Sequence, residues 1–200
     1  MIDPQMQLLI EEADKKKLDG QFQEAIGICE RILSYDLDCG EAYEEIGDNY
    51  LSLREYGKAK KALDRAMILN PYSPNGNYLL GFVYSCMSKW KTSIEYLERA
   101  DQLYPNHSEI LRCLGWSMYH DGQRKRGIIL LERALQLSPG DSLILNDLGV
   151  VYLNEKNFDR AGGLFKRVLD IEPDNEKARE CLNAVKFFDN EYKKINSRKK

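Results

Sequence analysis

The sequence has no long hydrophobic run and no paired cysteines, and these absences exclude several classes of protein. No stretch of its 200 residues approaches the roughly 18 consecutive apolar residues that a membrane-spanning helix needs. The first five residues have neither the basic start nor the apolar run of a secretory signal. The five cysteines are scattered, without a Cys-x-x-Cys pair, which is typical of free thiols in a reducing compartment. We therefore expect a cytoplasmic protein.

Residues that carry enzyme chemistry are also sparse. There are two histidines, and we find no glycine-rich phosphate loop, no metalloprotease His-Glu pair and no Gly-x-Ser-x-Gly elbow. Cys86, His120 and Asn154 recur at one repeat position, but two potential ligands about 10 Å apart on neighbouring helices do not make a metal site. We expect no catalytic residues, no metal and no cofactor.

The charge is weakly acidic and unevenly distributed. The net charge is −3 and the pI is about 5.6, which disfavours binding to a polyanion such as nucleic acid. Residues 6–50 hold twelve acidic and four basic residues, whereas residues 186–200 hold six basic and two acidic ones. Such an asymmetry can orient a charged partner.

The dominant feature of the sequence is a repeat of 34 residues. Aligning the chain with itself at this shift gives three columns of similar residues. The first column holds glycine or alanine in mid-helix, the second holds a residue after the helix end, which is proline in four of five copies, and the third holds small residues. They contain Ala13, Gly47, Gly81, Gly115 and Gly149; then Leu37, Pro71, Pro105, Pro139 and Pro173; then Ala25, Ala59, Ser93, Gly127 and Ala161. Apolar residues recur at three- and four-residue spacing on either side of a turn, so each unit predicts two helices. Because glycine inside a helix costs up to about 1 kcal/mol relative to alanine, its recurrence indicates close packing of the two helices.

Residues 77–84 (Asn-Tyr-Leu-Leu-Gly-Phe-Val-Tyr) and 145–152 (Leu-Asn-Asp-Leu-Gly-Val-Val-Tyr), with the later alanine and proline columns, resemble the tetratricopeptide repeat. The resemblance implies an all-α fold, a right-handed superhelical solenoid of five tetratricopeptide helix pairs plus a C-terminal capping helix. It implies one domain over residues 1–200. The expected parts are repeats 6–39, 40–73, 74–107, 108–141 and 142–175, a capping helix at about 176–192 and a basic tail at 193–200. The first repeat is the most divergent and more polar, as expected of a terminal cap.

The family lines its concave groove with the first helix of each pair, and this implies the residues that contact a partner. The second, fifth, ninth, twelfth and thirteenth positions of each first helix should face the groove. They predict an aromatic and polar partner-binding groove of Tyr78, Phe82, Arg112, Trp116, Tyr119, His120, Asn146 and Asn154. They also predict an acidic groove strip of Glu41, Glu44 and Asp48. Aromatic residues and arginine are common anchors of protein interfaces, and the acidic strip would suit a partner with basic residues.

These positions also test one known ligand of the family. Chaperone-binding members hold a C-terminal carboxylate with Lys and Asn at the fifth and ninth positions of an early unit, and no unit here has that pair. We expect a non-enzymatic adaptor or scaffold that binds a partner peptide or helix in the concave groove. Two alternatives stay open: a homo-oligomerising scaffold, and a secretion-type chaperone for a partner protein.

Overall fold

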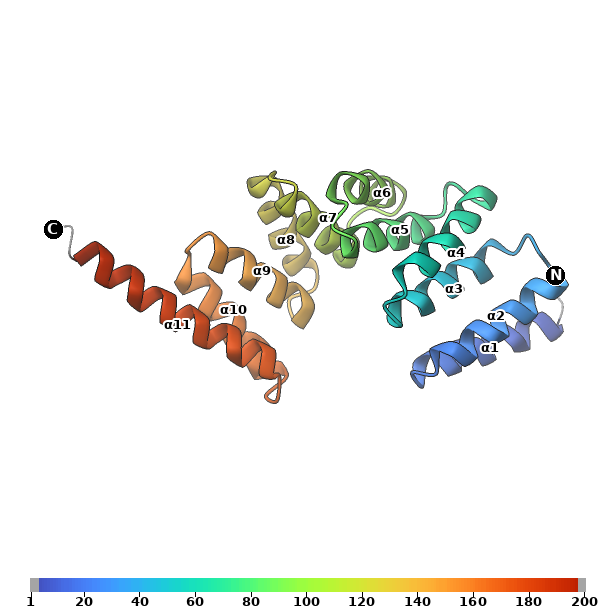
Figure 1. The fold of residues 1–200 in the computed structure, drawn as a ribbon, viewed down its shortest axis with the longest axis horizontal. Helices are drawn as coiled ribbons and strands as arrows, with labels where there is room; N and C mark the ends of the chain where they lie inside the picture. The colour runs from blue at the N-terminus through green and yellow to red at the C-terminus, as the bar shows by residue number, and fades with distance from the viewer. Residues whose placement is uncertain (1–3, 198–200) are drawn as a thin grey trace. The chain divides into compact units, whose positions relative to one another are not determined.

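The computed structural model describes residues 4–197, and this part of the chain is entirely helical, with eleven α-helices and no strand (Figure 1). The all-helical fold expected from the repeat is therefore confirmed. The helices are α1 (Pro4–Leu18), α2 (Phe22–Tyr35), α3 (Gly40–Ser52), α4 (Tyr56–Leu69), α5 (Pro74–Cys86), α6 (Trp90–Leu103), α7 (Ser108–His120), α8 (Arg124–Leu137), α9 (Ser142–Asn154), α10 (Phe158–Ile171) and α11 (Glu176–Ser197).

The first ten helices form five pairs, and α11 follows the fifth pair. From α3 onward the first helices begin 34 residues apart, and each pair combines a helix of 13 residues with one of 14. The two helices of a pair pack on each other, and α2, α4, α8 and α10 each also pack on the helix that follows. α11 runs to Ser197, five residues beyond the expected capping helix. Residues 198–200 of the expected basic tail lie outside the described residues.

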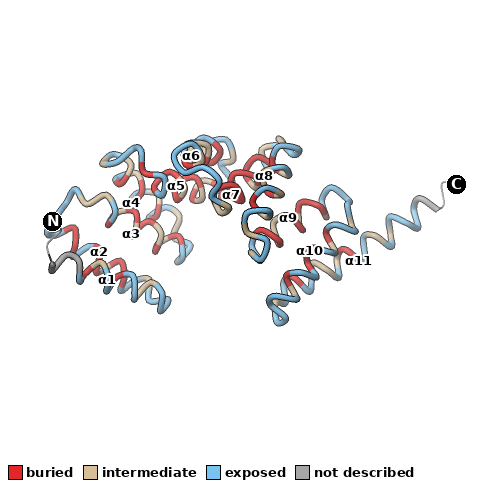
Figure 2. The backbone as a smooth tube through the Cα atoms, turned by 180° about the vertical axis from the view of Figure 1, so that it is seen from behind, coloured by how far each residue is buried: buried red, intermediate tan, exposed pale blue. Residues whose placement is uncertain are grey.

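The chain divides into two compact units, Met1–Pro105 and Asn106–Lys200, and each is described by itself. In both units buried residues recur along the helices, as the red segments of the backbone in Figure 2 show. The first unit has one apolar cluster around Ile28 and Ile46 and another around Leu63 and Leu80. In the second unit the main cluster is centred on Phe165. The single solenoid over residues 1–200, with its right-handed superhelix, stays a prediction.

The glycine column marks a close approach between the two helices of a pair. A Cβ atom at Gly81 would lie 2.5 Å from Cγ of Leu97, and one at Gly47 would lie 2.5 Å from Cγ of Leu63. At Gly115 the added atom would lie 2.8 Å from a backbone oxygen of the facing helix. Real Cβ atoms do not come this close, so glycine is required by packing, as the sequence indicated.

The first helix of each pair ends in the same turn, which recurs at one position of the repeat. In the turn between the two helices of each pair, one residue has a positive φ between 56° and 92°, at positions 34 apart: Gly20, Arg54, Ser88, Gly122 and Lys156. The next amide donates to the carbonyl five residues earlier, as in Lys89 N to Tyr84 O at 2.9 Å, which is a Schellman motif. This turn reverses the chain within three residues and so sets the pairing of the helices.

Candidate functional site

We use the term first-helix face for the surface formed by the first helices of the pairs, α3 and α5 in Met1–Pro105, and by α7, α9 and α11 in Asn106–Lys200. In the first unit this face carries Tyr78 and Phe82 on α5. Both are half-buried, and their rings stack with centroids 6.3 Å apart and planes 9° apart. The two predicted groove residues of this unit therefore lie together.

In the second unit α7 carries a cluster of three rings. Trp116 is half-buried and His120 is exposed, and their ring centroids are 4.4 Å apart. Tyr119 stands edge-on to His120 at 5.5 Å. Partial burial lowers the pKa of His120 below its usual value. Burial thus favours the neutral imidazole over the charged one.

Tyr119 differs from its two neighbours because it belongs to the core. Only 7% of it is exposed, and its hydroxyl donates to Glu155 at 3.0 Å. The guanidinium of Arg124 lies 5.9 Å from the ring centre. Tyr119 therefore supports the ring cluster from beneath and shows little surface to a partner.

Arg112 is held inside the second unit. It is 9% exposed, and its guanidinium donates to Glu109 at 2.8 Å and to Asp147 at 2.5 Å. Burial opposes the charge, but the hydrogen bond to Glu109 and the carboxylate of Asp147 outweigh it, so the pKa of Arg112 lies above its usual value. This network joins α7 to α9, and a direct contact between Arg112 and a partner stays a prediction.

The three acids of the predicted strip have different surroundings. Glu41 is exposed, whereas Glu44 is 8% exposed and accepts a hydrogen bond from Asn75 at 2.8 Å. Asp48 forms an ion pair with Lys17 at 2.5 Å. Two of the three carboxylates are thus engaged between helices of the first unit, which weakens the attraction expected for a basic partner.

Asn146 and Asn154 lie on α9. Asn146 is half-buried, and the exposed Asn154 lines a cavity of about 380 Å³ between α9, α10 and α11. Phe188 and Tyr192 of α11 line the same cavity, and Tyr192 stands edge-on to Phe158 with centroids 5.8 Å apart. The sequence reasoning missed these α11 residues, although a signal existed: Phe188 lies 34 residues after Asn154 and so continues the same repeat column.

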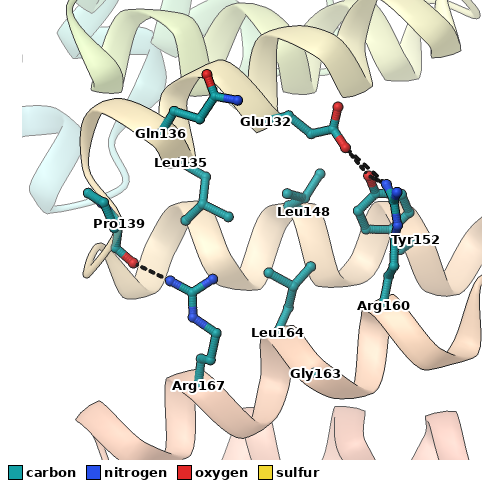
Figure 3. A pocket seen from close by; sticks show the side chains of 10 residues that line it. All are labelled: Glu132, Leu135, Gln136, Pro139, Leu148, Tyr152, Arg160, Gly163, Leu164 and Arg167. Atoms are coloured by element: carbon teal, nitrogen blue, oxygen red, sulfur yellow. Dashed lines mark hydrogen bonds and ion pairs between the residues drawn. The ribbon is translucent and has the colours of Figure 1, made fainter.

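A larger cavity of about 680 Å³ lies on the other side of the second unit, between the second helices α8 and α10, with α9 beneath (Figure 3). We call it the second-helix groove. Leu135, Leu148 and Leu164 form its middle, while Glu132, Tyr152 and Arg160 meet at one end and Arg167 at the other. Sequence reasoning did not foresee it, because the family resemblance directed attention to the first helices.

The described residues lack the features of two other site classes. Within residues 4–197 no group of three or more His, Cys, Asp or Glu is placed to hold a metal ion. The same part of the chain contains no helix that is both long and apolar enough to cross a membrane.

Comparisons of this chain with protein-family models and with solved structures indicate its family. Models of the tetratricopeptide repeat match residues 40–72 and 118–182. No curated protein matches the sequence. Among solved structures, TTC0263 of Thermus thermophilus, a tetratricopeptide repeat protein, is 18% identical over 91% of this chain and 99% of its own, with a TM-score of 0.77.

Two further solved structures have the same fold. A chain of the APC/C hetero-tetramer Cut9–Hcn1 is 21% identical over 86% of this chain, with a TM-score of 0.81, and this chain spans 35% of its length. YrrB, described as a TPR protein with an unusual peptide-binding site, is 23% identical over 86% of this chain and 89% of its own, with a TM-score of 0.63. The repeat columns, the five helix pairs and the matching repeat models agree, and the chain is a tetratricopeptide repeat protein.

Proposed function

We propose that this chain is a non-enzymatic adaptor or scaffold whose first-helix faces bind a segment of a partner protein. Tetratricopeptide repeat proteins generally mediate protein-protein interactions, and their fold is in general non-catalytic. The proposal rests chiefly on the aromatic side chains that the second unit presents around the 380 Å³ cavity.

The exposed aromatic area supports a binding role. Phe187, Phe188 and Tyr192 of α11 are 61%, 52% and 44% exposed. Neighbouring apolar groups left in water are unfavourable unless something covers them, and aromatic rings bury a large area with few rotatable bonds. The cavity is of a size to take an apolar side chain of a partner, with Asn154 at its edge to hydrogen-bond the partner's backbone.

The charged residues that line this cavity are Lys156 and Glu191, one of each sign. A partner segment therefore gains little from a net charge here and more from an aliphatic or aromatic anchor. The stacked Tyr78 and Phe82 offer a comparable surface in the first unit. YrrB provides a precedent for a peptide-binding site on this fold.

The test is a display selection of peptides on the wild-type chain, followed by affinity measurements on the selected peptides. Phe188→Ala and Tyr192→Ala should weaken binding about tenfold or more, in the range of an interface hot spot. Tyr72→Ala is the control, because Tyr72 is 77% exposed in a turn of the first unit and does not line the cavity. Equal affinities for all three variants would refute the assignment.

Self-association through α11 is the second candidate, and one observation favours it. Phe188, Tyr192 and Ile195 continue one exposed stripe to the end of the helix. In an antiparallel pair of α11 helices with Phe188 opposite Ile195, Asp189 of each copy would face Lys194 of the other, which is the self-complementary pattern of a two-fold interface. Light scattering over a concentration series decides it, since a monomer at every concentration would exclude this candidate.

A cytoplasmic location is part of the same proposal, and the cysteines support it. All five are free thiols in the described structure, two of them buried. Subcellular fractionation tests this location, and recovery of the protein with oxidised, paired cysteines would contradict it.

A further inference from the structure

The second-helix groove is open where one repeat has a glycine and a leucine in place of larger side chains. Gly163 and Leu164 line it, and a Cβ atom at Gly163 would have no neighbour within 4 Å. Two repeats earlier, the same columns hold Glu95 and Tyr96. There the ring of Tyr96 stacks on Tyr84, with centroids 5.6 Å apart and planes 12° apart. A ring thus lies where the second unit has only the side chain of Leu164.

The middle of the groove is apolar and rigidly built. Leu148 is 2% exposed and Leu164 is 8% exposed, so the core fixes both. Leu135 is packed against the same cluster. The volume of about 680 Å³ falls within the range of roughly 300–1,000 Å³ that is common for ligand sites. The floor offers aliphatic contact and no hydrogen-bonding side chain.

The two ends of the groove differ in charge balance. At one end Arg160 donates to the Tyr152 hydroxyl at 2.6 Å and pairs with Glu132 at 3.1 Å, so its charge is compensated. At the other end Arg167 donates to the carbonyl of Pro139 at 2.7 Å. Among the described residues, no carboxylate forms an ion pair with Arg167. This exposed guanidinium can bind an anionic group of a partner, because arginine donates two hydrogen bonds to a carboxylate in a bidentate geometry.

The charges near the groove have the same sign. The charged residues that line it are Glu132, Arg160 and Arg167, a net charge of +1, and α8 and α10 as whole helices contain seven basic and three acidic residues, a net charge of +4. Positively charged helices beside an apolar floor favour acidic segments with aliphatic side chains over basic ones. The Lys-rich end of this chain is therefore a poor occupant.

We propose that the second-helix groove docks an acidic segment of another protein, with aliphatic side chains on Leu135, Leu148 and Leu164 and a carboxylate on Arg167. The occupant is a short peptide or helix in which Leu or Ile residues lie three or four positions apart, with Asp or Glu residues between them. This site is independent of the first-helix face, so the protein would hold two partners, or two parts of one partner, at once.

The probe is a fluorescein-labelled peptide with two leucines four residues apart among glutamates, followed by fluorescence anisotropy on the intact chain. Two companion probes replace the leucines by serine or the glutamates by lysine. Heparin serves as a polyanion without aliphatic groups. We expect the acidic leucine peptide to bind, and both companion peptides to bind at least about tenfold more weakly.

Two variants locate the site, each with a matched control. Gly163→Phe fills the groove from an exposed helix position where a Cβ atom meets nothing, and Gly57→Phe makes the same change at an open position of α4. Arg167→Glu reverses the proposed anchor, and Arg133→Glu makes the same charge change on α8, where Arg133 contacts Asn106 and does not line the groove. Gly163→Phe and Arg167→Glu should each lower the affinity for the acidic leucine peptide about tenfold or more, and the two control variants should retain the wild-type affinity. Circular dichroism shows whether each variant is folded.

Three outcomes would overturn the proposal. One is no binding of the acidic leucine peptide at millimolar concentration. Another is an equal loss of peptide affinity in Arg167→Glu and Arg133→Glu with no change of affinity in Gly163→Phe, which would indicate non-specific attraction to a basic surface. The third is competition by heparin that equals that of unlabelled peptide, which would indicate a polyanion site.

Discussion

The close approach at Gly81 gives the sharpest test of the packing described above. Replacing Gly81 with alanine adds a Cβ atom 2.5 Å from Cγ and 2.9 Å from Cδ2 of Leu97, and 3.3 Å from the backbone nitrogen of the same residue. Leu97 is fully buried, so its side chain has no free space to move into. The backbone contact means that α6 itself must shift away from α5.

The expected loss can be estimated from two opposing effects. Alanine in mid-helix stabilises by about 1 kcal/mol relative to glycine. Overpacking a filled core costs about 1–3 kcal/mol, and the upper part of that range applies because a backbone atom is involved. Gly81→Ala should therefore lower the free energy of unfolding by about 2 kcal/mol, which is a fall of roughly 4–8 °C in Tm for a chain of this length.

Urea unfolding followed by circular dichroism measures the change, and Gly27→Ala provides the control. Gly27 lies in the middle of α2, where a Cβ atom would meet nothing within 4 Å, so this variant should be up to about 1 kcal/mol more stable than the wild type. In a Leu97→Ala background the cost of Gly81→Ala should become smaller, because the two clashing side-chain atoms are gone and only the backbone contact at 3.3 Å remains. If Gly81→Ala stabilises the chain as Gly27→Ala does, the close approach is not a constraint.

Three further predictions concern the turn column, the buried thiols and the ion-pair network. Ser88 has φ 56°, so Ser88→Gly should raise the free energy of unfolding by about 1 kcal/mol in urea melts, whereas a loss would argue against strain at this turn. Burial raises the pKa of Cys29 to about 12, so at pH 8.5 iodoacetamide should alkylate the exposed Cys86 well before Cys29, as read by mass spectrometry. Because the unfolded thiol ionises near pH 9, the stabilisation from neutral Cys29 is present below pH 9 and falls as the pH rises towards 12. Arg112→Met leaves the half-buried carboxylates of Glu109 and Asp147 without their cation and should cost about 3 kcal/mol, the lower end of the range for a buried pair. Adding Asp147→Leu should recover part of that loss, and no recovery would show that the two residues are not coupled.

The helical pairs could be predicted because the relevant information is local and repeated. The glycine and alanine columns, the prolines after the second helices of four pairs and the apolar spacing all recur every 34 residues, so each copy supports the assignment of the others. The extension of α11 to Ser197 was not predicted, because no proline or glycine follows to mark a helix end and the side chains there are mostly polar.

The candidate contact residues were harder to predict, because a repeat position gives the direction of a side chain and leaves its neighbours unspecified. Trp116 and His120 do lie together on α7. Arg112 and Glu44 have the same orientation in the pattern, yet the structure buries both against polar groups of the following first helix. Contacts between polar residues 31 to 35 positions apart depend on side-chain length and on local packing, which a column of residue types does not contain.

The sequence by itself determined the secondary structure, the pairing of helices and the positions where glycine is needed, since these depend on short-range spacing and on the volume of single residues. The tertiary structure alone decided which polar groups are used internally and where cavities remain. The second-helix groove shows the reason: Gly163 and Leu164 look unremarkable in the sequence, and only the packing of α8, α9 and α10 around them leaves an open site.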